Sequence, residues 1–128
     1  MKKILVIENN KNILEELTII LLFEDFMVYP TLNTYQGFQM LEEELPELVL
    51  VNIDIAKADG LNISEQLNSY SKINIPFIYY FADENMDLSI EKIYLTDNLS
   101  KPPIPLFLTD YIHSVINYEN QSKKLVTA

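Results

Sequence analysis

Short apolar runs alternate with segments of helical periodicity along the chain. The first run, from Ile4 to Ile7, is wholly aliphatic, which is typical of a strand buried on both faces of a sheet. Apolar residues from Ile13 to Leu21 then recur at helical spacing, with acidic side chains between them. The alternation continues to about residue 118 and predicts five strands and five helices.

The later elements follow from the same patterns. Beyond the first run, strands are expected at residues 27–32, 48–53, 77–81 and close to 99–100. Beyond the first helix, helices are expected at residues 35–41, 63–70, 84–94 and 104–116. Pro30 cannot donate a hydrogen bond to a neighbouring strand, so the second strand is expected at an edge of the sheet. Asn33 and Gln36 are spaced like a capping box and mark the start of the second helix.

Strands that alternate with helices form βαβ units, in which helices cover both faces of a parallel sheet. The predicted fold class is therefore α/β, with a three-layer αβα sandwich around a five-stranded parallel sheet. We expect residues 1–118 to form this domain. Residues 119–128 are predicted to be a C-terminal tail or the start of a linker.

The composition removes several classes of function. The net charge is −10, from 19 acidic and 9 basic residues, so the surface repels phosphate backbones and anionic membranes. We therefore expect neither nucleic acid nor a membrane as a partner of this domain. The chain has no cysteine, which excludes disulfides and thiolate chemistry. The N-terminal apolar run ends at Glu8, too early for a signal peptide, so a cytoplasmic location is predicted.

Candidate chemistry is expected where the strands end. Open parallel sheets bind ligands beyond the carboxyl ends of their strands, at the point where the strand order reverses. The residues at the carboxyl ends of the predicted strands, or just after them, include Glu8, Asn9, Asn52, Asp54, Phe81 and Lys101. The chain has only two glycines and contains neither a GxGxxG motif nor a P-loop, so a cradle for nucleotide phosphates is not expected.

Five stretches of the sequence resemble landmarks of the receiver domain of bacterial two-component response regulators. In order, they resemble the opening strand with its acidic pair, the strand that ends in the phosphoacceptor aspartate, an Asp-Gly turn, the fourth strand and a Lys-Pro corner. They are residues 3–10, 46–53, 58–61, 75–78 and 100–102. The resemblance spans about residues 2–118 and implies the sheet order 2-1-3-4-5 and a role in phosphorelay signal transduction.

The resemblance also assigns roles to positions, and several positions depart from the family pattern. Receivers hold Mg²⁺ with two adjacent acidic residues; Glu8 and Asn9 stand there, so a neutral amide replaces one carboxylate. Asn52 stands at the phosphoacceptor position, and a carboxamide oxygen is a poor nucleophile toward phosphorus. Phe81 stands where the family has a hydroxyl that bonds the phosphoryl group. Asn98 stands at the position of the aromatic switch residue.

Three charged side chains remain at the predicted pocket. Lys101 matches the lysine of the family, and we expect it to pair with Glu8 or Asp54 and to hold the corner closed. Asp54, two residues after Asn52, is an alternative phosphoacceptor. Together with Glu8 it is also an alternative, weak pair of ligands for Mg²⁺.

These features lead to the hypothesis of an atypical receiver domain that is not an enzyme and acts by phosphorylation-independent protein–protein contact. The expected partner is a signalling protein such as a histidine kinase or an output domain, and the expected state is a monomer or weak homodimer. Two alternatives remain, namely a receiver that accepts phosphate on Asp54 and a small-molecule sensor on the same fold. No cofactor is expected beyond weakly bound Mg²⁺. Tyr79 and Tyr80 are interpreted as core and rim aromatics, and His113 as a surface or boundary residue.

Overall fold

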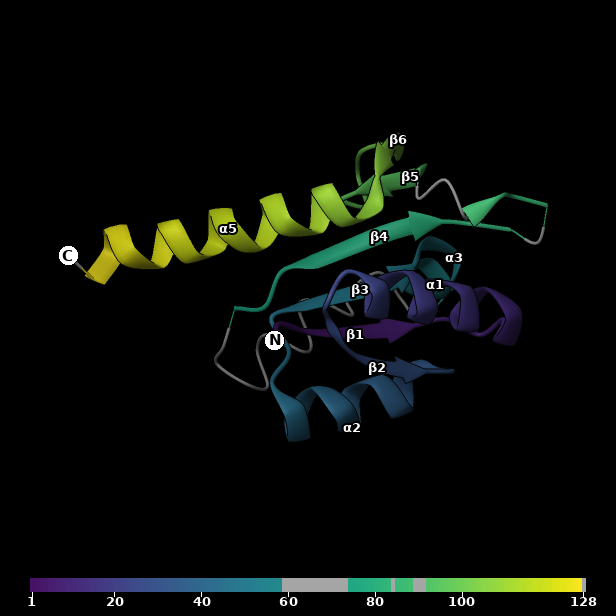
Figure 1. The fold of residues 1–128 in the computed structure, drawn as a ribbon, viewed down its shortest axis with the longest axis horizontal. Coiled ribbons are helices and arrows are strands. Elements are labelled where there is room, and N and C mark those ends of the chain that lie inside the picture. The colour runs from purple at the N-terminus through teal and green to yellow at the C-terminus, as the bar shows by residue number, and fades with distance from the viewer. Residues whose placement is uncertain (59–73, 84, 89–91, 128) are drawn as a thin grey trace.

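The structure, a computed structural model, describes residues 1–58, 74–83, 85–88 and 92–127 of the chain. Figure 1 shows the strands side by side in one sheet, flanked by helices. The strands are β1 (Lys3–Ile7), β2 (Met27–Thr31), β3 (Leu48–Asn52), β4 (Phe77–Phe81), β5 (Lys92–Thr96) and β6 (Ile104–Phe107). The helices are α1 (Lys11–Phe23), α2 (Thr34–Glu44), α3 (Ile53–Ala58) and α5 (Leu108–Thr127).

The most aliphatic strands lie inside the sheet, whose order is β2-β1-β3-β4-β5-β6. Every residue from Ile4 to Ile7 in β1 and from Leu48 to Val51 in β3 is fully buried. The strands β2, β1, β3 and β4 run parallel to one another. The strand β2 contains Pro30 and lies at the edge, as the missing amide hydrogen predicted.

Alternate side chains of β1 enter two separate cores. Ile4 and Val6 belong to the core that includes residues of α1 and α5. Leu5 and Ile7 belong to the core that includes residues of α2 and α3. Helices therefore cover both faces of the sheet, and the predicted α/β class with a layered arrangement is confirmed.

The far edge of the sheet differs from the prediction of five parallel strands. The sheet has six strands, and both β4–β5 and β5–β6 are antiparallel pairs. A parallel crossover needs a dozen or more residues, and residues 82–91 are too few to cross back, so the chain reverses direction.

Two predicted elements at this edge are therefore wrong, and a third, the last helix, begins later than predicted. The helix expected at 84–94 is not formed by its described residues, because β5 begins at Lys92. The strand expected near 99–100 is a loop between β5 and β6, and residues 104–107 form β6 before α5 begins. The helix expected at 63–70 and the turn at Asp59-Gly60 lie outside the described residues.

The last helix, α5, extends beyond the sheet. It buries Leu108, Ile112 and Ile116, and Figure 1 shows its C-terminal half projecting past the strands. The helix continues through residue 118, where the sequence pattern places the end of the domain, and reaches Thr127. Within the described ranges, none of the helices combines the length and the apolar character that crossing a lipid bilayer requires.

Gly37 is expected to be essential for the close packing of α2 on β1. A Cβ atom at this position would lie 2.6 Å from Cδ1 of Ile7, which is fully buried and cannot move into solvent. We expect Gly37→Val to lower the free energy of unfolding by about 2 kcal/mol through overpacking. Gln39→Val on the exposed side of α2 is the control and is expected to change it by less than about 0.5 kcal/mol. Equal losses in urea unfolding experiments would contradict this packing argument.

Candidate functional site

Three polar side chains meet at the carboxyl ends of β1, β3 and β4. Glu8 directly follows β1, Asn52 is the last residue of β3, and Tyr80 pairs with Asn52 in the register of β3 and β4. Strand alternation places all three on the face covered by α1 and α5, because each lies two residues beyond an apolar residue of that core. We call Glu8, Asn52 and Tyr80 the buried network.

Glu8 is the centre of the buried network and is completely inaccessible to solvent. Its Oε1 accepts hydrogen bonds from Nδ2 of Asn52 at 2.9 Å and from the hydroxyl of Tyr80 at 2.7 Å. Its Oε2 accepts a hydrogen bond from the backbone N–H of Asn10 at 2.8 Å. Burying a carboxylate is costly unless its oxygens are bonded, and here three donors serve the two oxygens.

Asn52 uses both ends of its carboxamide. While Nδ2 donates to Glu8, Oδ1 accepts a hydrogen bond from the backbone N–H of Asp54 at 2.8 Å, at the start of α3. The residue is only 7% exposed, so water cannot easily replace either bond. The position therefore suits a side chain that donates at one end and accepts at the other, which a carboxylate cannot do when ionised.

Tyr80 is held in its protonated form. Burial raises the pKa of its hydroxyl well above the usual value, and the negative charge of Glu8 and the hydrogen bond to that carboxylate raise it further. The hydroxyl therefore remains a hydrogen-bond donor to Glu8 throughout the physiological pH range.

This raised pKa predicts a loss of stability in alkali. Above pH about 10 the unfolded chain releases the proton of Tyr80 and the folded chain retains it, so the free energy of unfolding falls as pH rises. Because of Tyr80 alone, the free energy of unfolding is expected to fall by up to about 1.4 kcal/mol per pH unit. Urea unfolding at pH about 9 and about 11 should show a weaker pH dependence for Tyr80→Phe than for the wild-type chain. Tyr29 and Tyr111, whose pKa values are also raised, remain in both proteins and affect both alike. Identical pH dependences would therefore contradict the raised pKa of Tyr80.

Asn9 and Asp54 lie outside the buried network. Both are exposed and line a separate cavity of about 430 Å³ between the ends of β1 and β2 and the helix α3. In the part of the chain that the structure describes, no group of three or more metal-ligating side chains is arranged to hold a metal ion. The residues predicted for Mg²⁺ do not fit such a site, because Glu8 is sealed from solvent and its oxygens already accept three hydrogen bonds.

Phe81 does not lie beside Glu8, where the family resemblance places the residue that replaces the hydroxyl. It points to the opposite face from Tyr80, is 39% exposed and packs edge-on against Tyr94, with ring centroids 6.4 Å apart. The side chain beside Glu8 is therefore that of Tyr80. Sequence reasoning treated Tyr80 only as a core or rim aromatic, although its two-residue spacing from the buried Ile78 places both on one face.

Lys101 does not form the predicted ion pair. It is exposed in the loop between β5 and β6, where its backbone N–H donates to the carbonyl oxygen of Asn98. The predicted pairing with Glu8 is wrong, because the described contacts of that carboxylate are with Asn10, Asn52 and Tyr80.

Asn98 lies in the same loop as Lys101 and organises a turn. Its Oδ1 accepts hydrogen bonds from the backbone and the hydroxyl of Ser100, at 2.9 and 2.7 Å. His113 is exposed and its ring lies 4.9 Å from that of Phe26, which confirms it as a boundary residue.

Residues 4–113 match the sequence profile of the response regulator receiver domain. The chain belongs to this family. As a receiver domain, it is a module of two-component signalling. Its sequence has no significant match among curated proteins.

Solved receiver structures share the fold. The receiver domain of NtrC4 from Aquifex aeolicus superposes with a TM-score of 0.59 at 16% identity, over 92% of this chain and 95% of that one. A response regulator receiver domain protein from Clostridium thermocellum gives a TM-score of 0.56 at 20% identity, over 62% of this chain and 64% of that one. The N-terminal domain of a response regulator/sensory box/GGDEF three-domain protein from Carboxydothermus hydrogenoformans gives 0.51 at 21% identity, over 70% and 73%. The present chain thus covers less than two thirds of the Clostridium thermocellum chain.

Proposed function

We propose that this receiver domain signals through protein–protein contact without being phosphorylated, and that it is not an enzyme. The observation that carries the proposal is the state of Asn52, which stands at the phosphoacceptor position of the family. Its carboxamide is bonded to Glu8 at one end and to the backbone of Asp54 at the other. An amide oxygen that carries no negative charge and already accepts a hydrogen bond is poorly suited to attack phosphorus.

The rest of the buried network supports the same conclusion. Acceptor chemistry in a receiver needs an accessible carboxylate and a metal ion, whereas Glu8 is fully buried and bonded to three donors. A ligand or modification can shift a conformational equilibrium only if it interacts differently with the two states. In this domain the binding of a partner protein, in place of an acyl phosphate, supplies that difference.

The partner class follows from the charge and from the family. A net charge of −10 disfavours nucleic acid and anionic membranes, so the partner is a signalling protein such as a histidine kinase or an output domain. We place this interaction in the cytoplasm, with the domain as a monomer or a weak homodimer. Any output activity belongs to another domain or to the partner.

One observation favours a second candidate function, in which Asp54 accepts the phosphate. Its carboxylate is exposed, and it follows Asn52 by two residues at the same edge of the sheet. The cavity that Asp54 shares with Asn9 would likewise be the place for a small molecule if the domain were a sensor.

Incubation with acetyl phosphate and Mg²⁺, followed by intact mass measurement, separates these functions. We expect the mass of the wild-type chain to remain unchanged. A gain of one phosphoryl group that disappears in an Asp54→Asn variant would establish the second candidate and overturn the first. The matched control is Asp110→Asn, which removes an exposed carboxylate from α5 and leaves the predicted pocket intact.

A further inference from the structure

A groove lies between α1 and two described stretches that follow β4, namely Asp83 and residues 86–88. It consists of two adjoining cavities of about 450 and 290 Å³, which share Glu16 and Ile19 of α1 as lining residues. Asp83 lines the first cavity, and Met86 and Leu88 line the second. The groove is separate from the buried network and contains none of its residues.

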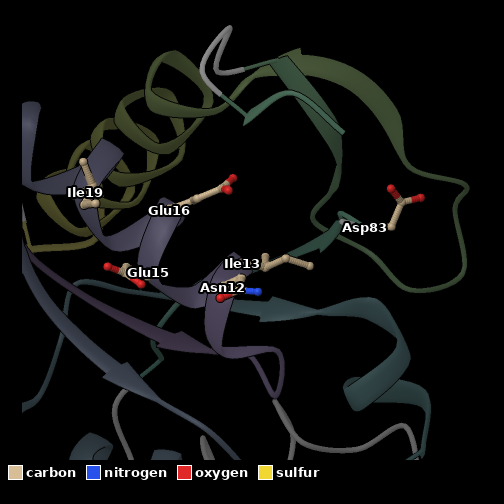
Figure 2. A pocket seen from close by; sticks show the side chains of 6 residues that line it. All are labelled: Asn12, Ile13, Glu15, Glu16, Ile19 and Asp83. Carbon is tan, nitrogen blue, oxygen red and sulfur yellow. The ribbon is translucent and has the colours of Figure 1, made fainter. Parts of the chain in front are cut away.

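The rim of the groove is acidic. Figure 2 shows Glu16 extending from α1 into the space that separates this helix from Asp83. Glu15 also lines this cavity. Among the described residues, no cationic side chain lies within ion-pair distance of these three carboxylates. Like charges on both sides of one groove repel each other, so a bound cationic group would relieve this repulsion.

The second cavity is lined mostly by apolar side chains, and further exposed apolar side chains follow along α1. Ile19 is 47% exposed, and Leu22 and Phe23, three and four residues further on, are 52% and 81% exposed. Residues at this spacing form one stripe on a helix, so the apolar surface extends from the groove toward the end of α1. The face of α1 that carries both the acidic and the apolar side chains runs from residue 12 to residue 23, a length of about 18 Å or about three helical turns.

We infer that this groove binds a basic amphipathic helix of a partner protein. An apolar stripe of the partner packs on Ile19 and the neighbouring apolar residues, as in other helix-in-groove complexes. Flanking lysine or arginine side chains pair with Glu15, Glu16 and Asp83. The strongly negative net charge steers such a partner toward the domain. The inference rests on the proposed function, because it names the chemistry of the partner.

The test uses the full chain and two synthetic peptides of about 15 residues, which form about four helical turns. Both carry leucines at positions i, i+3, i+4 and i+7. One has lysines at the flanking positions and the other has glutamates. In fluorescence anisotropy we expect saturable binding of the lysine peptide and at least tenfold weaker binding of the glutamate peptide. Amide chemical-shift changes should map to α1, to Asp83 and to residues 86–88.

Matched variants test the acidic rim. The double variant Glu15→Gln/Glu16→Gln is expected to weaken binding of the lysine peptide about fivefold, because each exposed ion pair contributes modestly. The control Glu42→Gln/Glu43→Gln removes the same charge from exposed positions of α2 and is expected to change affinity less than about twofold.

Any one of four binding outcomes would overturn the inference, and so would a fifth outcome, self-association. The four are equal binding of the two peptides, equal weakening by the two double variants, shift changes confined to other surfaces, and absence of saturable binding. Self-association of the chain through this groove, detected by sedimentation and abolished by the α1 variant, would also overturn it. None of these outcomes depends on whether the chain gains a phosphoryl group, so the mass measurement tests the proposed function separately.

Discussion

Asn52→Asp is expected to lower the free energy of unfolding at neutral pH by about 3 kcal/mol. The change replaces the donor that Glu8 receives at 2.9 Å with a second carboxylate. Two carboxylates cannot both ionise at this distance in a buried site without a large electrostatic cost. The substitution would thus introduce the acidic residue typical of the family and at the same time destabilise the fold.

The loss caused by Asn52→Asp is expected to depend on pH. The pKa of the buried pair of carboxyl groups is raised in the folded state, so the folded variant binds a proton that the unfolded chain releases above pH about 4. Stability is therefore lost as pH rises, and the deficit relative to wild type should be largest near pH 7 and small near pH 4. Urea unfolding at both pH values measures this difference.

Asn33→Asp provides the control for this charge change. Asn33 is exposed and caps α2, where its side chain accepts a hydrogen bond from the backbone N–H of Gln36. A carboxylate can accept the same bond and is favoured at a helix N-terminus, so we expect a change within about 0.5 kcal/mol. If Asn52→Asp were equally harmless, Asn52 would not be the fixed donor to Glu8 that the structure describes.

Tyr80→Phe is expected to lower the free energy of unfolding by about 2 kcal/mol. The substitution preserves the ring in the core and removes only the hydroxyl that donates to Glu8 at 2.7 Å. A hydrogen bond to a buried charged group contributes more than one between neutral groups, and its loss leaves the carboxylate with one donor fewer. Tyr94→Phe, at an aromatic that is 44% exposed, is the control and should cost less than about 0.5 kcal/mol. Similar losses in the two variants would show that the hydroxyl of Tyr80 does not stabilise Glu8.

The parallel part of the fold could be predicted because its sequence signals are local and consistent. The aliphatic runs Ile4 to Ile7 and Leu48 to Val51 identify strands buried on both faces, and they form the inner strands β1 and β3. Parallel strands end at the same edge, so the meeting of Glu8 and Asn52 also follows from the pattern. The sequence therefore predicts both the location of the site and two members of the buried network.

The antiparallel edge could not be predicted from periodicity. Leu88 and Ile93 fit a helical pattern, and both do enter the core beneath α1 and α5, but Ile93 does so from β5. The short connection between β4 and β5 decides against a crossover, and connection length carries no signal in the periodicity. The predicted ion pair of Lys101 fails for the same reason, because the loop that carries Lys101 follows an antiparallel strand that lies beyond β4.

The role of Tyr80 was missed because aromatic residues occupy four of the five positions in β4. Such a run does not reveal which residues face which side, and a shift of one position exchanges the two faces. Assigning the site to Phe81 in place of Tyr80 is an error of this kind. The alternation of buried residues in the structure resolves it, because Tyr80 shares a core with Ile78.

A crystal structure of the chain grown with Mg²⁺ and beryllofluoride, an analogue of a phosphoryl group, is the decisive measurement. We predict that Glu8 will still accept hydrogen bonds from Asn52 and Tyr80, and that neither the metal ion nor the fluoride group will occupy the ends of β1 and β3. Beryllofluoride bound to Asn52 or Asp54, with Mg²⁺ coordinated by Glu8, would contradict a signalling role that does not depend on phosphorylation.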